Sequence, residues 1–338
     1  MSKKSLKGLA ALSIAALLIG NANAAVALEA PDSSHKALLN LSKVSSDTNV
    51  DVLNTSVEAK ANVSGEGAFD LTVEGSEIFV PNSPSDPVEI GSEDTDVVSI
   101  YRPIDGVSKT EPIANGVIEN KGKEFTTVTS VKDDGGLQMA TILHDSQSPE
   151  RFEYLLDVPS EATIRETHGG VLIEDKEGEL IGGFTPPWAK DANGNDVPTR
   201  YLVEGNTLVQ IVDHQSAENL AYPVVADPVY RKGIVKNVVH ERWKNGGWEI
   251  RFTVTALAYW YQPFNPSYVY KMGLDDLREH HPRSMAKATM AQQWDCHVRG
   301  LHLVKNVDLE SKRKSWPGWR KGIPSAVLKK NPPKACNW

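Results

Sequence analysis

The stretch AYPVVADP, at residues 221–228, divides the sequence into two parts of different composition. Of the 36 lysines and arginines, 20 follow Pro228, whereas only 8 of the 44 aspartates and glutamates do. Residues 229–338 therefore carry a formal charge of +12, and the residues before them carry −20. Seven of the eight tryptophans and both cysteines also follow Pro228. A simultaneous change in charge, aromatic content and sulfur predicts two modules.

The N-terminus has the three parts of a secretory signal peptide. Three lysines in the first seven residues precede an uncharged run at 8–20, and Ala-Asn-Ala follows at 22–24. We therefore predict cleavage after Ala24, or alternatively after Ala27, and a secreted protein that is extracellular or associated with the cell wall. A short buried helix is the alternative interpretation of the apolar run. No later stretch approaches the roughly 18 apolar residues of a membrane span, so we expect no transmembrane segment in the mature protein.

Residues 25–65 are rich in Ser, Asn, Asp, Val and Ala and have only weak apolar periodicity, which predicts a flexible leader with a short helix. Residues 66–228 form an acidic part with short apolar runs separated by turn residues. The strand-like runs lie at 69–73, 77–80, 97–101, 125–131, 137–143, 152–158, 170–174 and 207–212. They predict a β-rich domain of antiparallel sheets, either one sandwich or two small β units joined near Pro149.

The end of this acidic part also carries a family resemblance. The segments that carry it are YLLDVP at 154–159, TPPW at 185–188, DANG at 191–194, VPTRY at 197–201 and YPVVADP at 222–228. Together they resemble a module found in many secreted actinobacterial proteins, where it precedes a variable C-terminal domain. The resemblance implies no activity, because none is assigned to that module.

Residues 229–338 predict a small, basic, Trp-rich α+β domain. Two β-branched and aromatic runs, at 234–243 and 248–261, flank Lys-Asn-Gly-Gly. This pattern predicts a β-hairpin, because Asn-Gly readily adopts the positive φ of a tight turn. We expect helices at 274–280 and 284–297 and a short last strand at 307–310.

The two cysteines of this domain, Cys296 and Cys336, are expected to pair. Export would place them in an oxidising compartment, where two cysteines in one module usually form a disulfide. The alternative is two unrelated buried thiols. A bridge that closes this loop would stabilise the module by about 4 kcal/mol.

A second resemblance rests on MAQQWDCHV at 290–298, VDLE at 307–310 and ACNW at 335–338. These segments resemble an uncharacterised C-terminal domain family, a domain of unknown function, of secreted actinobacterial proteins. The family usually has Trp-Asn where this chain has Val307-Asp308, and Pro where it has Trp338. The resemblance covers roughly 234–338 and implies a fold and a disulfide, but no function.

Catalytic residues are hard to identify in this sequence. The candidates are His297, His302 and Lys305, because two histidines and a lysine serve a metal-independent ribonuclease as acid, base and phosphate clamp. The alternative for His297 is a structural histidine on a packed helix face. The histidines lack the spacing of a metal site, and the common hydrolase and phosphate-binding motifs are missing. We therefore predict no metal and no cofactor, and we do not favour an enzyme.

Basic and aromatic side chains alternate in the C-terminal part, which suits binding of polyanions and their sugars through ion pairs and stacking. The alternative is a solvated basic face over a Trp-rich core. The candidate binding residues are Arg242, Trp243, Trp248, Lys312, Arg313, Lys314, Trp316, Trp319, Arg320 and Lys321.

Two functions from different classes follow from these patterns. The leading hypothesis is a secreted cell-envelope module that binds a polyanion such as wall teichoic acid or anionic lipid. The alternative is a secreted toxin-like effector, such as a nuclease, with the acidic half as propeptide or inhibitor. An envelope protein without a ligand is a third alternative. The opposite charges of the halves also predict an acidic–basic contact between them within the chain.

Overall fold

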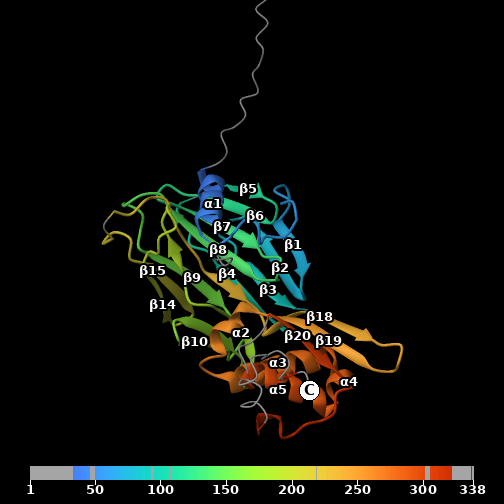
Figure 1. Cartoon of the computed structure of the whole chain (residues 1–338). Helices are drawn as coiled ribbons and strands as arrows, with labels where there is room; N and C mark the ends of the chain where they lie inside the picture. The colour runs from blue at the N-terminus through green and yellow to red at the C-terminus, as the bar shows by residue number, and fades with distance from the viewer. Residues whose placement is uncertain are drawn as a thin grey trace, which may run out of the picture.

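The structure is a computed structural model that describes residues 33–45, 50–92, 95–106, 109–217, 219–300, 305–321 and 336. The predicted signal peptide and its cleavage sites lie outside the described residues. Two large antiparallel sheets make up the N-terminal two thirds of the described chain, and a smaller sheet with four helices follows them (Figure 1). The prediction of antiparallel sheets is confirmed.

The first sheet has seven strands in the order β1-β2-β3-β4-β9-β15-β14. Its strands alternate between buried and exposed residues: in β9, Phe152, Tyr154 and Leu156 are buried, and the residues between them are exposed. One face of this sheet is therefore packed and the other faces solvent. The strands are β1 (Gly67–Val73), β2 (Ser76–Pro81), β3 (Val88–Ser92), β4 (Thr95–Tyr101), β9 (Arg151–Asp157), β14 (Thr199–Glu204) and β15 (Thr207–Val212).

The second sheet has ten strands, with β10-β11-β12-β17-β8-β7-β6-β5 as its main path and β13 and β16 beside it. Its strands are β5 (Thr110–Ala114), β6 (Val117–Lys121), β7 (Phe125–Val131), β8 (Leu137–Leu143), β10 (Thr163–Thr167), β11 (Gly170–Glu174), β12 (Leu180–Phe184), β13 (Ala189–Lys190), β16 (Val224–Ala226) and β17 (Val229–Arg231). Apolar residues of both large sheets meet in one hydrophobic core.

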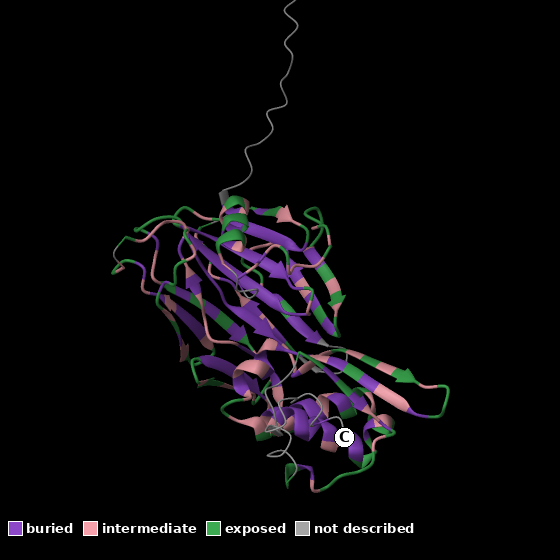
Figure 2. Ribbon diagram, in the orientation of Figure 1, coloured by how far each residue is buried: buried purple, intermediate pink, exposed green. Residues whose placement is uncertain are grey.

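Strands β7 and β8 are buried along their whole length (Figure 2). One face of each strand belongs to the core shared by the two sheets. The opposite face packs against Leu38 and Leu41 of helix α1 (Ser33–Val44) and against Val50 and Val52. The leader predicted as flexible over 25–65 is therefore, in its described part, packed onto the second sheet. The burial of its few apolar residues outweighs its weak helical periodicity.

The predicted boundary at Pro228 falls inside the second sheet. Strands β16 and β17, on either side of Pro228, both pair with β8, and the carbonyl of Pro228 accepts a hydrogen bond from the Met139 N–H at 2.9 Å. Val229 and Tyr230 are buried in the shared core or beside it. The sheet therefore continues to Arg231, because the apolar residues that follow Pro228 complete it.

The C-terminal part contains a three-stranded antiparallel sheet, β18-β19-β20, and four helices. The predicted hairpin is confirmed by the pairing of β18 with β19, and the last strand by β20. The elements are β18 (Val235–Arg242), β19 (Trp248–Val254), α2 (Ala256–Tyr261), α3 (Pro266–His280), α4 (Pro282–Met285), α5 (Ala288–Gly300) and β20 (Asn306–Glu310).

The predicted elements differ from the observed ones at three places in this part. The helix predicted over 284–297 is divided, because Ser284 belongs to α4 and α5 begins at Ala288. The run 256–261, predicted as strand, is helix α2, and the Thr255 side chain caps its N-terminus by accepting the Ala258 N–H. Helix α3 begins earlier than predicted, at Pro266, where the Asn265 side chain accepts the Tyr268 N–H.

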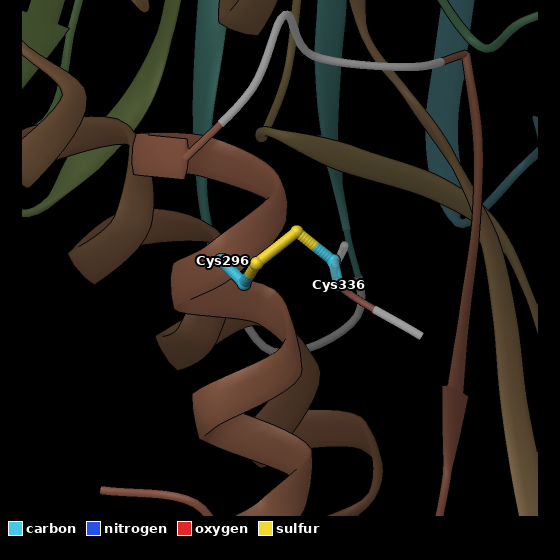
Figure 3. The surroundings of a disulfide bond; sticks show 2 residues. All are labelled: Cys296 and Cys336. Carbon is cyan, nitrogen blue, oxygen red and sulfur yellow. A yellow bond between two sulfur atoms is a disulfide. The ribbon is translucent and has the colours of Figure 1, made fainter. Parts of the chain in front are cut away.

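Cys296 of α5 and Cys336 form a disulfide, with an S–S distance of 2.02 Å and a Cα–Cα distance of 5.5 Å (Figure 3). The prediction of this pair is confirmed. Both cysteines are fully buried, and Trp319 packs against them with 3% of its surface exposed. None of the helices among the described residues is both long and apolar enough to cross a bilayer.

The C-terminal part packs on the β11 and β12 end of the second sheet. Leu172 of β11 belongs to the C-terminal hydrophobic core rather than to the core of the two large sheets. The ring of His168 stacks on Phe264 with centroids 3.8 Å apart, and Trp260 Nε1 donates to the His168 carbonyl at 3.3 Å. The two parts are therefore joined by the buried Leu172 and by aromatic contacts that are partly open to solvent.

Candidate functional site

The largest group of predicted binding residues lies at the tip of the β18–β19 hairpin, which projects from the body of the molecule in Figure 1. Here a pocket of about 320 Å³ is lined by Arg242, Trp243 and Trp248 of the hairpin and by Arg283 of α4. We name it the hairpin pocket. The other lining residues are His240, Gly246, Gly247 and Ser284.

The turn chemistry of the hairpin holds a third cation, Lys312, near the pocket but outside its lining. Trp243 N–H donates to the Gly247 carbonyl at 2.8 Å, and Gly246 adopts a φ of +81°. A Cβ on Gly247 would lie 2.7 Å from both the Trp243 ring and the Lys312 side chain, so glycine lets them pack together there. Lys312 Nζ is held at this turn by the Asn245 carbonyl at 2.8 Å.

Trp248 forms the inner wall of the hairpin pocket. Its backbone N–H donates to Ser311 Oγ at 2.7 Å, and Lys287 Nζ lies 5.7 Å from its ring centroid, within the range of a cation–π contact. Lys287 Nζ also donates to the Ser311 carbonyl. A fourth cation is thus fixed beside the indole.

One histidine, His240, lines the same pocket, and a second, His281, stacks against it. The rings of His240 and His281 stack with centroids 5.6 Å apart, and His240 Nε2 lies 2.9 Å from Ser284 Oγ. Burial, and then the neighbouring His240 and His280, lower the pKa of His281. The lowered pKa of His281 favours its neutral ring beside the pocket.

The remaining predicted binding residues divide by their environment. Trp319 is buried against the disulfide, and Arg320 lies over its ring and pairs with Asp295 at 3.0 Å. Arg313 pairs with Glu310. These three side chains therefore have packing or charge partners within the C-terminal part. Lys314, Trp316 and Lys321 are exposed, with Trp316 38% accessible.

The three candidate catalytic residues do not meet in one cavity among the residues that the structure describes. His297 is 6% exposed on α5, where burial and then Arg313 lower its pKa to about 4, and its Nε2 has no hydrogen-bond partner. Lys305 instead lines a cleft that does not include His297. His302 lies outside the described residues. At neutral pH His297 is neutral and shielded from solvent.

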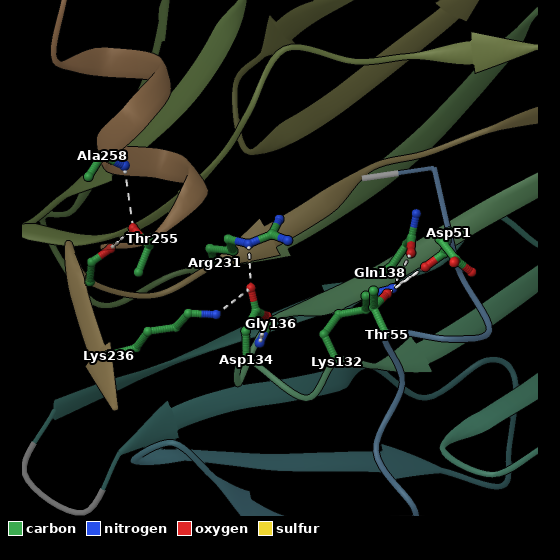
Figure 4. Close-up of polar contacts among 11 residues, drawn as sticks. Asp51, Thr55, Lys132, Asp134, Gly136, Gln138, Arg231, Lys236, Thr255 and Ala258 are labelled. Atoms are coloured by element: carbon green, nitrogen blue, oxygen red, sulfur yellow. Dashed lines mark hydrogen bonds and ion pairs between the residues drawn. The ribbon is translucent and has the colours of Figure 1, made fainter. Parts of the chain in front are cut away.

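Sequence reasoning missed a cleft of about 780 Å³ between the β-rich part and the C-terminal part. We name it the junction cleft. At its floor Asp134 Oδ2 accepts from Arg231 Nε and from Lys236 Nζ, each at 3.1 Å (Figure 4). Burial alone would raise the pKa of Asp134, but the two cations outweigh it and lower the pKa to about 2.

Two further ionisable groups in the junction cleft are almost inaccessible to water. Lys132 Nζ donates to the Asp51 carbonyl at 3.1 Å and to Gln138 Oε1 at 3.0 Å, and burial and then Arg231 lower its pKa to about 8. Burial raises the pKa of Asp227 to about 8, so this carboxyl is largely protonated at neutral pH. The residues that line the cleft are up to 250 positions apart in the sequence, from Thr55 to Lys305. No local sequence pattern could therefore have indicated the cleft.

No metal site emerges from the described ranges: they contain no group of three or more His, Cys, Asp or Glu side chains that could hold an ion. Comparisons with protein-family models, with curated proteins and with solved structures found no match.

Proposed function

We propose that this chain is a secreted protein of the bacterial cell envelope and that its hairpin pocket binds an anionic wall polymer such as teichoic acid. In this proposal the two large sheets form one sandwich that carries the C-terminal part. That part belongs with the uncharacterised actinobacterial C-terminal domains that its Cys-His helix and closing Cys-Asn resemble.

The observation that carries the proposal is the gathering of four cations around two indoles of the hairpin, two of them in the pocket lining and two beside it. Arg242 and Arg283 line the hairpin pocket, Lys312 packs beside Trp243, and Lys287 lies over Trp248. Guanidinium groups pair with phosphate oxygens, and indole faces stack on sugar or polyol carbons. A polymer of phosphates and sugars offers both kinds of group in repeated order.

The acidic half has little opportunity to mask this pocket. The residues that line the hairpin pocket all come from 240–284, and the acidic half contributes none of them. The ion pairs between the two parts lie at the junction instead, where Lys236 pairs with Asp134 and Lys271 pairs with Glu179. Binding by the whole protein is therefore expected, without prior removal of the acidic half.

The nuclease alternative has less support. It would need His297 to exchange protons with a substrate, and this side chain is 6% exposed on a packed helix. No described contact brings Lys305 to it.

The test is retention of the whole protein on teichoic-acid-bearing walls and on heparin across a salt series. Arg242→Ala with Arg283→Ala should lower the affinity at low salt at least about tenfold and flatten the dependence of log affinity on log salt by about 2. A matched control removes two exposed cations elsewhere, Lys176→Ala with Arg200→Ala, and should bind nearly as the parent does. Equal losses in the two double variants would reduce the effect to net charge and refute a site at the hairpin.

A further inference from the structure

The junction cleft has the size and the walls of a ligand site separate from the hairpin pocket. Its volume of about 780 Å³ lies within the range typical of small-molecule sites and far exceeds the space that a single phosphate needs. Both parts of the chain contribute walls to it, and such junctions are common places for binding sites.

Two adjacent rings at the end of α2 form an aromatic wall of the cleft. Tyr259 and Trp260 both line it and are half-buried. Trp260 is held in place by its Nε1 hydrogen bond to the His168 carbonyl. Its ring also packs on Gly170, where a Cβ would lie 2.6 Å from the indole. A ring fixed in this way offers a flat apolar face at small entropic cost.

Two sets of polar groups in the cleft differ in whether they already have partners. Asp134, Arg231 and Lys236 satisfy one another at the floor. Among the described residues, by contrast, the Lys305 ammonium has no ion pair, and the Thr185 and Tyr259 hydroxyls have no hydrogen bond. The exposed Asp133 carboxylate likewise accepts no hydrogen bond, although it lies close enough to Lys132 to influence its charge. This second set is available to a ligand.

We infer that the junction cleft binds a short oligosaccharide that carries an acidic group. Trp260 stacks on the face of a sugar ring, Asp133 and Thr185 hydrogen-bond to its hydroxyls, and Lys305 pairs with the carboxylate or phosphate. An uncharged apolar ligand would leave Lys305 and Asp133 to be desolvated without a partner, which costs free energy. An inorganic anion alone would leave the aromatic wall unused.

The experiment is isothermal calorimetry of the full-length protein with three trisaccharides: trigalacturonate, maltotriose 6-phosphate and neutral maltotriose. We expect saturable binding of at least one acidic trisaccharide, at least tenfold tighter than maltotriose; which one binds distinguishes a carboxylate from a phosphate ligand. Trp260→Ala should weaken this binding at least tenfold. Lys305→Ala should remove the preference for the acid, and Lys305→Arg should restore it.

The controls separate this site from the hairpin pocket. Trp243→Ala and the double variant Arg242→Ala with Arg283→Ala should bind the acidic trisaccharide as the parent protein does, whatever their effect on polymer retention. Lys305 is exposed, so its substitution leaves the fold intact and keeps the test valid if Trp260→Ala unfolds. No saturable heat with either acid at millimolar concentration, equal binding of maltotriose, or loss of binding in the hairpin variants would overturn the inference.

Discussion

The β-rich part and the C-terminal part of this molecule are stabilised in different ways. The large sheets share one extended apolar core, and helix α1 covers a second apolar cluster on β7 and β8. The C-terminal core is smaller, includes Leu172 from the neighbouring sheet, and lies in a part that is closed by a disulfide. The smaller part therefore depends on a cross-link and on its contact with the larger one.

The largest expected effect is that of removing the cross-link. The disulfide closes a loop with a sequence separation of 40, for which the chain-entropy relation gives about 4 kcal/mol. Cys336→Ser should therefore lower the free energy of unfolding of the C-terminal part by about that amount and leave the β-rich part nearly unchanged. Urea unfolding followed by tryptophan fluorescence reports the C-terminal part, which holds seven of the eight tryptophans.

The control for this prediction is the parent protein under reducing conditions, which should unfold as Cys336→Ser does. Two transitions are expected, and only the one seen by tryptophan should move. If reductant leaves both transitions in place, the disulfide contributes nothing to the free energy of unfolding. The two parts would then not differ in their dependence on a cross-link.

The next effect in size comes from the contact between the parts. Asp134 holds Arg231 of the large sheet and Lys236 of the hairpin, and Asp134→Asn would leave both cations without their carboxylate. We expect a loss of about 3 kcal/mol at pH 7, because breaking a largely buried ion pair costs more than the pair contributes. The adjacent exposed residue gives a matched control, since Asp133→Asn removes the same charge without breaking a pair.

The pH dependence gives an independent check on Asp134. Its pKa is lowered to about 2, so its contribution is present above the ordinary value of 3.8 and is lost as the pH falls through 2. The difference in stability between the parent and Asp134→Asn should therefore shrink between pH 4 and pH 2. A difference that stays constant over this range would show that the loss is steric rather than electrostatic.

Local signals made part of this molecule predictable. Period-two alternation identified strands such as β9, Asn245-Gly246 identified the hairpin, and the two cysteines identified the disulfide. The predictions that failed concern residues whose packing partners are distant in sequence. Apolar residues as far back as Leu38 pack on the face of β7 and β8, and no local pattern indicates that.

The candidate sites divide in the same way. The hairpin pocket was predictable in part, because Arg242, Trp243 and Trp248 are close in sequence and a two-stranded turn brings them together. The junction cleft was not, because its walls come from segments that meet only after both parts have folded. The ion pairs of Arg313 and Arg320 were also hidden, since a basic run gives no sign of which charges have partners within the fold.

The smallest of the expected effects is the loss of stability of the C-terminal part at acidic pH. Burial and the charge of Arg313 lower the pKa of His297 from 6.5 to about 4. The folded state therefore prefers the neutral ring, and the stability that this preference represents is present above pH 6.5 and is lost as the pH falls through 4. Between pH 8 and pH 5 this residue alone should cost about 2 kcal/mol.

Variants isolate the contribution of His297 to the pH dependence of stability better than the parent protein does. In the parent, the titration of Asp276 changes the stability in the opposite direction over the same pH range. Burial raises its pKa to about 6, so its contribution is lost as the pH rises from 3.8 through 6. His297→Gln cannot titrate and should flatten the pH dependence of the tryptophan-detected transition by about 2 kcal/mol relative to the parent. If His297→Gln retains the full loss of stability at pH 5, then His297 protonates in the folded state and is open to solvent, which would also restore it as a candidate acid for catalysis.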